Sequence, residues 1–263
     1  MSFLQSEDGS EISQLELWLL TEAQWSDVAL IEQARQQWQQ LRALLPVQGS
    51  LMNRFDAVMQ LFYQQALFTA PLQQLRLSHL PEPALIHHAL LKREAEPLVL
   101  SLILIDMLLL SGLEVQPVWY QQQLVLQVRL SAAEKIWLDP VSGQWQCLLK
   151  PENGLVGTLA DEMKQVPGSF SQLEQRLWQQ QKQLFLLCGQ KEKSLAIVQH
   201  LLSQKPDDPF LRRERALILE LLDHWSLAIA DYQYFVEQRP DDPLNEQIQQ
   251  QIRQLSCYSQ SLH

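Results

Sequence analysis

The chain has 263 residues, of which 46% are hydrophobic and 19% charged, a composition typical of globular proteins large enough for two domains. Its net charge of −10 disfavours direct binding to nucleic acid or to an anionic membrane, because both need a basic surface. The opening stretch MSFLQSEDGSE lacks a signal-peptide pattern, and the three cysteines, Cys147, Cys188 and Cys257, lie too far apart to suggest a disulfide framework. These features predict a cytoplasmic protein.

Helices are predicted throughout the first ninety residues, where apolar side chains recur three and four positions apart. Residues 12–45 contain two such helices, and Asp27 is suited to cap the second of them. Further helices are predicted at 51–67 and 84–91.

The central stretch, residues 98–113, reads LVLSLILIDMLLLSGL. Its length as a helix is about 24 Å, short of the roughly 30 Å hydrocarbon core, and the acidic Asp106 also argues against a membrane span. We predict a helix buried nearly all round, with Pro97 in its first turn and Gly112 at its C-terminal cap. Asp106 is interpreted as a core carboxylate with hydrogen-bond partners, or as part of a partly exposed face, in preference to a functional residue.

After Glu114 the hydrophobic period changes to two, which predicts strands at 115–119, 124–130, 136–138 and 145–149. Asp139 and Pro140 begin a turn between the last two strands. The first domain is therefore predicted to be α+β, residues 1–155, with helices followed by an antiparallel sheet of three or four strands. Residues 156–172 have the composition of a linker.

The last part of the chain, residues 173–263, is predicted to be an all-α repeat domain. The sequence QKPDDP at 204–209 recurs as QRPDDP at 238–243, at the 34-residue period of a tetratricopeptide repeat. The small, aromatic and proline positions of that repeat hold Ala216, Ala228, Tyr232, Phe235 and Pro240.

A basic cluster in the second repeat, Arg212, Arg213 and Arg215, is the candidate lining of a partner groove. A solvated face that balances the acidic turns is the simpler alternative.

This order of segments, with LAIADYQYFVEQRPDDP at 227–243, resembles the bacterial SirB-type proteins, which join a transglutaminase-like domain to tetratricopeptide repeats. The resemblance covers essentially the whole chain and implies a papain-like fold. In such folds a Cys nucleophile begins the central helix, a His base follows on the next strand and an Asp on the strand after it. Here Pro97 stands at the nucleophile position and Gln123 at the base position, and only Asp139 matches.

Because Pro has no nucleophile and Gln cannot take up a proton near neutral pH, the resemblance implies a pseudoenzyme. The leading hypothesis is a non-catalytic interaction or scaffold protein, and a regulatory protein that acts through protein partners is a further hypothesis. It would bind a protein or peptide through its repeats, with no cofactor, metal, membrane or direct nucleic-acid contact and with its oligomeric state open. The alternative is a cysteine-dependent hydrolase or transglutaminase-type enzyme with a relocated site.

Other reactive residues are given structural interpretations. The three cysteines are predicted to be packing residues, with Cys147 buried on a strand. His87 and His88 point apart on a helix, so structural or solvated roles are favoured over a metal site.

Overall fold

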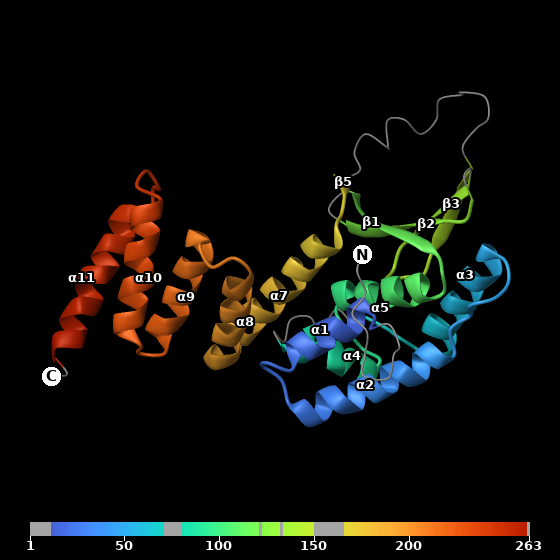
Figure 1. Cartoon of the computed structure of the whole chain (residues 1–263), viewed down its shortest axis with the longest axis horizontal. Helices are drawn as coiled ribbons and strands as arrows, with labels where there is room; N and C mark the ends of the chain where they lie inside the picture. Colours follow the sequence, from blue (N-terminus) through green and yellow to red (C-terminus); the bar gives the residue numbers. More distant parts are fainter. Residues whose placement is uncertain (1–11, 71–79, 121–122, 132–133, 150–165, 262–263) are drawn as a thin grey trace. The chain divides into compact units, whose positions relative to one another are not determined.

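The computed structural model of the chain describes residues 12–70, 80–120, 123–131, 134–149 and 166–261 (Figure 1). The chain forms two compact units, Met1–Gln179 and Gln180–His263, and the division falls within helix α7, Phe170–Leu187. The first unit contains helices and an antiparallel sheet, and the second is helical. The predicted fold class, α+β followed by all-α, is confirmed.

The first unit begins with the predicted helices. In chain order these are α1 (Gln14–Glu22), α2 (Val28–Ala43), α3 (Leu51–Met59), the π-helix η1 (Gln60–Gln65), the 3₁₀ helix η3 (Glu82–Ala84) and α4 (Ile86–Lys92). Asp27 caps α2 as predicted, since its carboxylate accepts a hydrogen bond of 2.8 Å from the backbone N–H of Ala29.

The central helix is α5 (Pro97–Leu110), and every residue from 99 to 108 is buried. Pro97 is its first residue, and Gly112 follows its end in the left-handed conformation, φ +75°. The N–H of Leu113 donates to the carbonyl of Leu108, and that of Gly112 to Leu109, which closes the helix in a Schellman motif. None of the described helices, α5 included, is both long and apolar enough to cross a membrane.

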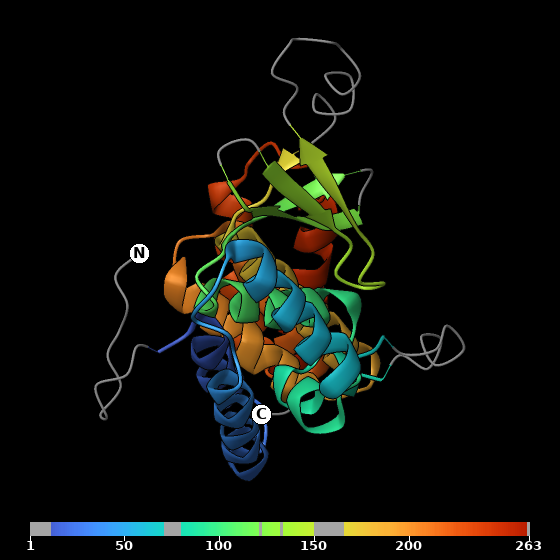
Figure 2. The ribbon, with the colours of Figure 1, turned by 90° about the vertical axis from the view of Figure 1, so that its right-hand side faces the viewer.

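The sheet follows α5 in the chain and packs on it. Its strands are β1 (Glu114–Tyr120), β2 (Gln123–Arg129), β3 (Glu134–Leu138), β4 (Trp145–Leu149) and β5 (Val166–Pro167), in the order β4-β3-β2-β1-β5. In Figures 1 and 2 the sheet lies on one side of α5, and α1, α2 and α4 lie on the other. The apolar run is thus buried all round because both sides of the helix are covered.

The structure divides the chain later than the predicted bounds of 155 and 173. Of the predicted linker, 156–172, residues 156–165 lie outside the described part, while Val166–Pro167 pairs with β1. The first half of α7 packs within the first unit, where the Trp178 ring meets Trp25 edge-on at 5.2 Å. Because of this packing, the first unit extends to Gln179, past the segment 156–172 whose composition suggested a linker.

The second unit has the geometry of the predicted repeats. It consists of the end of α7 and of α8 (Lys191–Gln204), α9 (Pro209–Leu221), α10 (Trp225–Gln238) and α11 (Asn245–Ser261). Each of the two Pro-Asp-Asp-Pro turns has an aspartate that accepts from a backbone N–H two residues later, and Asp208 is the N-cap of α9. Asp208 accepts a hydrogen bond of 2.9 Å from the N–H of Phe210, and Asp242 one of 3.0 Å from Leu244.

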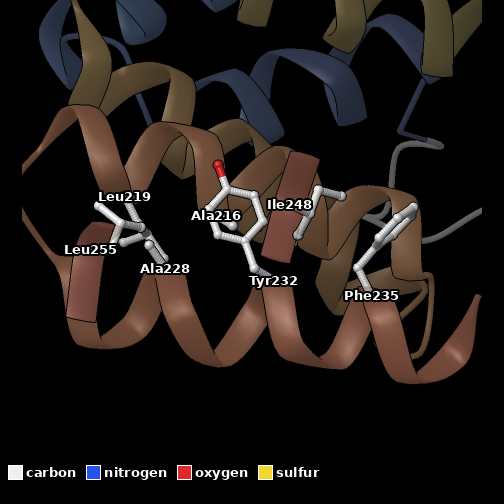
Figure 3. Close-up of a cluster of buried hydrophobic side chains, with 7 residues drawn as sticks. All are labelled: Ala216, Leu219, Ala228, Tyr232, Phe235, Ile248 and Leu255. Atoms are coloured by element: carbon white, nitrogen blue, oxygen red, sulfur yellow. The ribbon is translucent and has the colours of Figure 1, made fainter. Parts of the chain in front are cut away.

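The small and aromatic repeat positions form the core between α9, α10 and α11 (Figure 3). The cluster contains Ala216, Leu219, Ala228, Tyr232, Phe235, Ile248 and Leu255. In Figure 3 the Tyr232 ring projects from α10 into this cluster, with its hydroxyl at the far end. The alanines let the helices approach closely, as tetratricopeptide packing requires.

Candidate functional site

The N-terminus of α5 is the first candidate site, because the resemblance places a nucleophile there. Pro97 is half-buried, and its carbonyl accepts a hydrogen bond of 2.6 Å from Ser101 Oγ one turn later. The preceding N-cap residue, Glu96, makes no side-chain capping bond. Neither Glu96 nor Pro97, the residues that begin this helix, provides a thiol.

The segment that leads into α5 is held by backbone hydrogen bonds. The N–H of Ala95 donates to the carbonyl of Thr69 at 3.1 Å, and the N–H of Glu96 donates to that of Pro83 at 2.7 Å. Ala95 is fully buried, and Arg93 lies over the Phe68 ring at 4.9 Å. The backbone just before Pro97 is thus held by hydrogen bonds to two separate segments, at Thr69 and at Pro83.

Gln123 and Asp139 lie at one end of the sheet, since Gln123 opens β2 and Asp139 follows the last residue of β3. In the β2–β3 ladder Leu126 pairs with Leu138, and both are fully buried on the face that packs on α5. Side chains alternate along a strand, so the exposed Gln123 and Asp139 belong to the opposite face. The structure brings these two positions near each other but not onto the face that meets α5.

A hollow of about 540 Å³ lies beside Asp139 on this outer side. Its lining includes Val125, Trp137, Asp139, Gly143, Trp145 and Gln146. Neither Pro97 nor Gln123 lines it, so this hollow does not unite the three positions.

The Asp139 carboxylate is used within its own turn. Oδ1 accepts a hydrogen bond of 2.9 Å from the Val141 N–H, and Oδ2 accepts one of 2.7 Å from Ser142 Oγ. The Asp139 carbonyl also accepts from the N–H of Gly143 at 2.9 Å. Asp139 therefore stabilises its own turn, which is the role expected of an aspartate at this position without a histidine partner.

Tyr63, which the sequence did not single out, fastens this turn to η1. Its hydroxyl donates a hydrogen bond of 2.8 Å to the carbonyl of Pro140. Burial, and secondarily the charge of Asp139, raise the pKa of Tyr63. Gly143 has φ +72°, and a Cβ there would lie 3.0 Å from the Tyr63 ring. The glycine is needed both for the backbone conformation and for this close approach.

We expect Gly143→Ala to lower the free energy of unfolding of the first unit by about 1–3 kcal/mol, from left-handed strain plus the clash with Tyr63. Gly189→Ala is the matched control, because Gly189 has φ +74° and nothing within 4 Å of an added Cβ. Urea titration followed by hydrogen exchange measures the loss of stability of each variant in its own unit, the first for Gly143→Ala and the second for Gly189→Ala. Equal losses in the two variants would contradict a specific role for the Tyr63 contact.

Asp106, the acidic residue within the apolar run, is 4% exposed. Its carboxylate accepts hydrogen bonds from the Ser13 side chain and from the backbone of Leu15, at the first turn of α1. Burial raises its pKa to about 6 despite these bonds, with a smaller contribution in the same direction from Glu16. Asp106 is therefore a core carboxylate beside the first turn of α1, as interpreted, but its Oδ2 has no hydrogen-bond partner among the described residues.

One of the two adjacent histidines, His87, has a structural partner. His87 Nδ1 lies 2.6 Å from Glu22 Oε1, and the fully buried Glu22 also accepts from the backbone N–H groups of Ile86 and His87. Among the described residues, no group of three or more His, Cys, Asp or Glu side chains is placed to hold a metal ion.

The prediction that Cys147 is buried is wrong, and Cys188 and Cys257, which were predicted to be packing residues, are exposed as well. Cys147 pairs with the buried Ile136, but it lies on β4 at the edge of the sheet, where the core no longer covers it. Alternation with apolar residues predicted the strand correctly and its burial incorrectly.

The three arginines of the second repeat do not share one surface. Arg215 forms a two-point contact with Asp231, with Nε and Nη2 at 2.6 and 2.7 Å from its oxygens, and Arg212 approaches the same carboxylate at 3.5 Å. This hydrogen bonding raises the pKa of Arg215. Asp231 is 2% exposed, so Arg212 and Arg215 neutralise a buried charge.

Arg213 is the member of the predicted cluster that lines a groove. This groove, between α9 and α11, has a volume of about 420 Å³ and is lined mainly by Arg213, Leu217, Glu220, Tyr232, Leu244 and Ile248. We call it the α9–α11 groove.

The fold thus defines a protein with a helical and antiparallel-sheet domain followed by tetratricopeptide-type helices. Residues 29–162 match the family described as transglutaminase-like superfamily, and residues 182–253 match the family described as tetratricopeptide repeat. The chain belongs to the transglutaminase-like superfamily. No curated protein and no solved structure matches it.

Proposed function

We propose that the chain is a catalytically degenerate, SirB-type member of the superfamily, which acts in the bacterial cytoplasm by binding a protein partner through its repeats. The interaction role is supported above all by the α9–α11 groove, which combines exposed leucines with charged ends. In this proposal the first unit serves as a scaffold, and a regulatory effect would be exerted through the bound partner.

Three side-chain roles support the absence of catalysis. Pro97 offers no nucleophile, and Gln123 has no basic nitrogen to accept a proton. Asp139 directs both carboxylate oxygens to groups of its own turn, so it is not available to orient a base.

Leu217→Glu in the intact chain tests the interaction role, because Leu217 lines the groove and is 50% exposed. Leu227→Glu is its matched control, since Leu227 lies on α10 outside the groove lining and is 58% exposed. We expect proteins cross-linked and captured with the wild-type chain to be lost with Leu217→Glu and retained with Leu227→Glu. Recovery of the same partners with both variants would contradict the proposal.

The rival hypothesis, a thiol enzyme with a relocated site, is favoured by one observation: all three cysteines are exposed. Iodoacetamide labelling across pH, read out cysteine by cysteine, distinguishes the two. Under our proposal folding makes none of the three thiols more reactive; the usual pKa of a free Cys is about 8.5. A thiol that reacts in the folded chain with a midpoint well below that value would support the enzyme.

A further inference from the structure

The α9–α11 groove carries opposite charges at its two ends. Arg213, Leu217 and Glu220 line it from α9 at helical positions i, i+4 and i+7, so they form one stripe on that helix. Seven residues of helix rise about 10 Å, so the backbone positions of Arg213 and Glu220 are about 10 Å apart along α9. Leu217 and Leu244, which are 50% and 40% exposed, provide apolar surface in the groove.

At the basic end, Arg213 is held by aromatic rings. Its guanidinium lies 5.0 Å from the centre of the Phe235 ring and 5.7 Å from that of Phe210. Within the described part of the chain no carboxylate forms an ion pair with Arg213, whereas Arg212 and Arg215 both pair with Asp231. The ring contacts orient the Arg213 charge without neutralising it.

At the acidic end, Glu220 is held by neutral donors. Its Oε2 accepts a hydrogen bond of 2.9 Å from the Tyr232 hydroxyl, and Gln251 Nε2 donates to Oε1. Burial first, and then the hydrogen bond with Glu220, raise the pKa of Tyr232. No described Lys, Arg or His side chain forms an ion pair with Glu220. The carboxylate is therefore fixed in position by neutral donors and forms no ion pair with a described cation.

We propose that the groove takes an amphipathic helix of the partner, with an acidic side chain, an apolar side chain and a basic side chain at positions i, i+4 and i+7. The acidic group would pair with Arg213, the apolar group would pack on Leu217 and Leu244, and the basic group would pair with Glu220. This inference rests on the proposed interaction role and specifies the chemistry of the partner.

A helical occupant is preferred because the three groove positions on α9 are themselves separated by helical spacing. Side chains at i, i+4 and i+7 of a second helix form a stripe of the same length, about 10 Å. An extended segment presents side chains i, i+2 and i+4 on one face, and these span about 13 Å, so they fit the stripe less well.

The test uses fluorescein-labelled, alanine-rich helical peptides about 16 residues long. One probe carries Glu, Leu and Lys at i, i+4 and i+7, and the others replace Glu, Lys or both by Gln. We expect fluorescence anisotropy with the full chain to give a Kd roughly three- to tenfold lower for the Glu-Leu-Lys probe than for either single-Gln probe.

Two charge-neutralising variants locate each contact. Arg213→Gln is expected to abolish the preference for Glu over Gln and to keep the preference for Lys. Glu220→Gln, which leaves an acceptor for the Tyr232 hydroxyl, should do the reverse. Arg253→Gln and Glu246→Gln are matched controls, because these exposed α11 residues lie outside the groove lining and should leave both preferences intact.

Equal affinity for all four probes, no measurable binding of the Glu-Leu-Lys probe, or preferences that persist in both groove variants would overturn this inference. If Leu217→Glu still abolished partner capture in that case, the proposed interaction role would stand and only the charge pattern would fall. If partner capture were unaffected by Leu217→Glu, the interaction role itself would fall.

Discussion

Asp231→Ala is expected to lower the free energy of unfolding of the second unit by about 3–5 kcal/mol, the usual cost of removing one partner from a buried ion pair. Asp231 is 2% exposed, and the substitution leaves the guanidinium groups of Arg212 and Arg215 without their carboxylate. A unit of this size has roughly 4–12 kcal/mol of stability in total. The repeat would therefore be close to unfolding.

Hydrogen-exchange mass spectrometry at increasing urea concentration measures this loss, because peptides from α9 and α10 report on the second unit separately. Asp231→Asn, which keeps one acceptor oxygen, should cost less than Asp231→Ala. Glu237→Ala, which removes an exposed carboxylate from the same helix, should change stability by at most about 0.5 kcal/mol. A loss for Asp231→Ala as small as that of Glu237→Ala would refute the structural role of the pair.

This ion pair also decides which arginines can test partner binding. Reversing the charge of Arg212 or Arg215 would place a second negative group beside Asp231 and would disrupt α9 and α10 whether or not a partner binds. Arg213 has no such internal carboxylate partner among the described residues. Loss of binding in an Arg213 variant is consequently the more interpretable result.

The repeats could be predicted from the sequence because their period and their turns are local. The recurring Pro-Asp-Asp-Pro stretches contain residues that end one helix and favour the start of the next. Asp208 is the N-cap of α9, and Asp242 accepts from Leu244, the residue before α11. The central helix was predictable for a similar reason, since Pro97 and Gly112 mark its ends. Strand β5 was not, because two residues, Val166–Pro167, give no alternating pattern.

The contacts of the candidate sites were much less predictable. Arg212, Arg213 and Arg215 form one cluster in the sequence, but helical geometry turns Arg213 toward a different surface from the other two. Tyr63 reaches Pro140 across 77 positions from within a π-helix, and neither feature has a sequence signal. Side-chain partners distant in sequence depend on tertiary packing, which hydrophobic periodicity does not encode.

Asp106 gives the second large effect, a dependence of stability on pH. In the folded chain burial raises the pKa of Asp106 to about 6, whereas an unfolded Asp has a pKa of about 3.9. Below about pH 4 the carboxyl is protonated in both states, and as pH rises through 6 the folded state must hold a buried negative charge. The stability that this group contributes at low pH is therefore lost between about pH 4 and 6, by about 3 kcal/mol.

Asp106→Asn should remove this loss, because the amide oxygen can still accept from Ser13 and Leu15 but does not ionise. We expect the difference in unfolding free energy, variant minus wild type, to rise by about 3 kcal/mol from pH 4 to pH 7. Taking this difference cancels the titration of the other groups. Urea titrations read from peptides of α1 and α5 measure it in the first unit.

Asp56→Asn, at an exposed position on α3, is the matched control, and its difference from wild type should change by less than about 0.5 kcal/mol over the same range. Parallel pH profiles for Asp106→Asn and wild type would mean that Asp106 ionises as readily in the folded chain as in the unfolded one. Arg42, the nearby cation, would then offset the burial that this position in the core imposes. A difference that rises by about 3 kcal/mol would instead identify Asp106 as a carboxyl that stabilises the junction of α5 and α1 best when it is protonated.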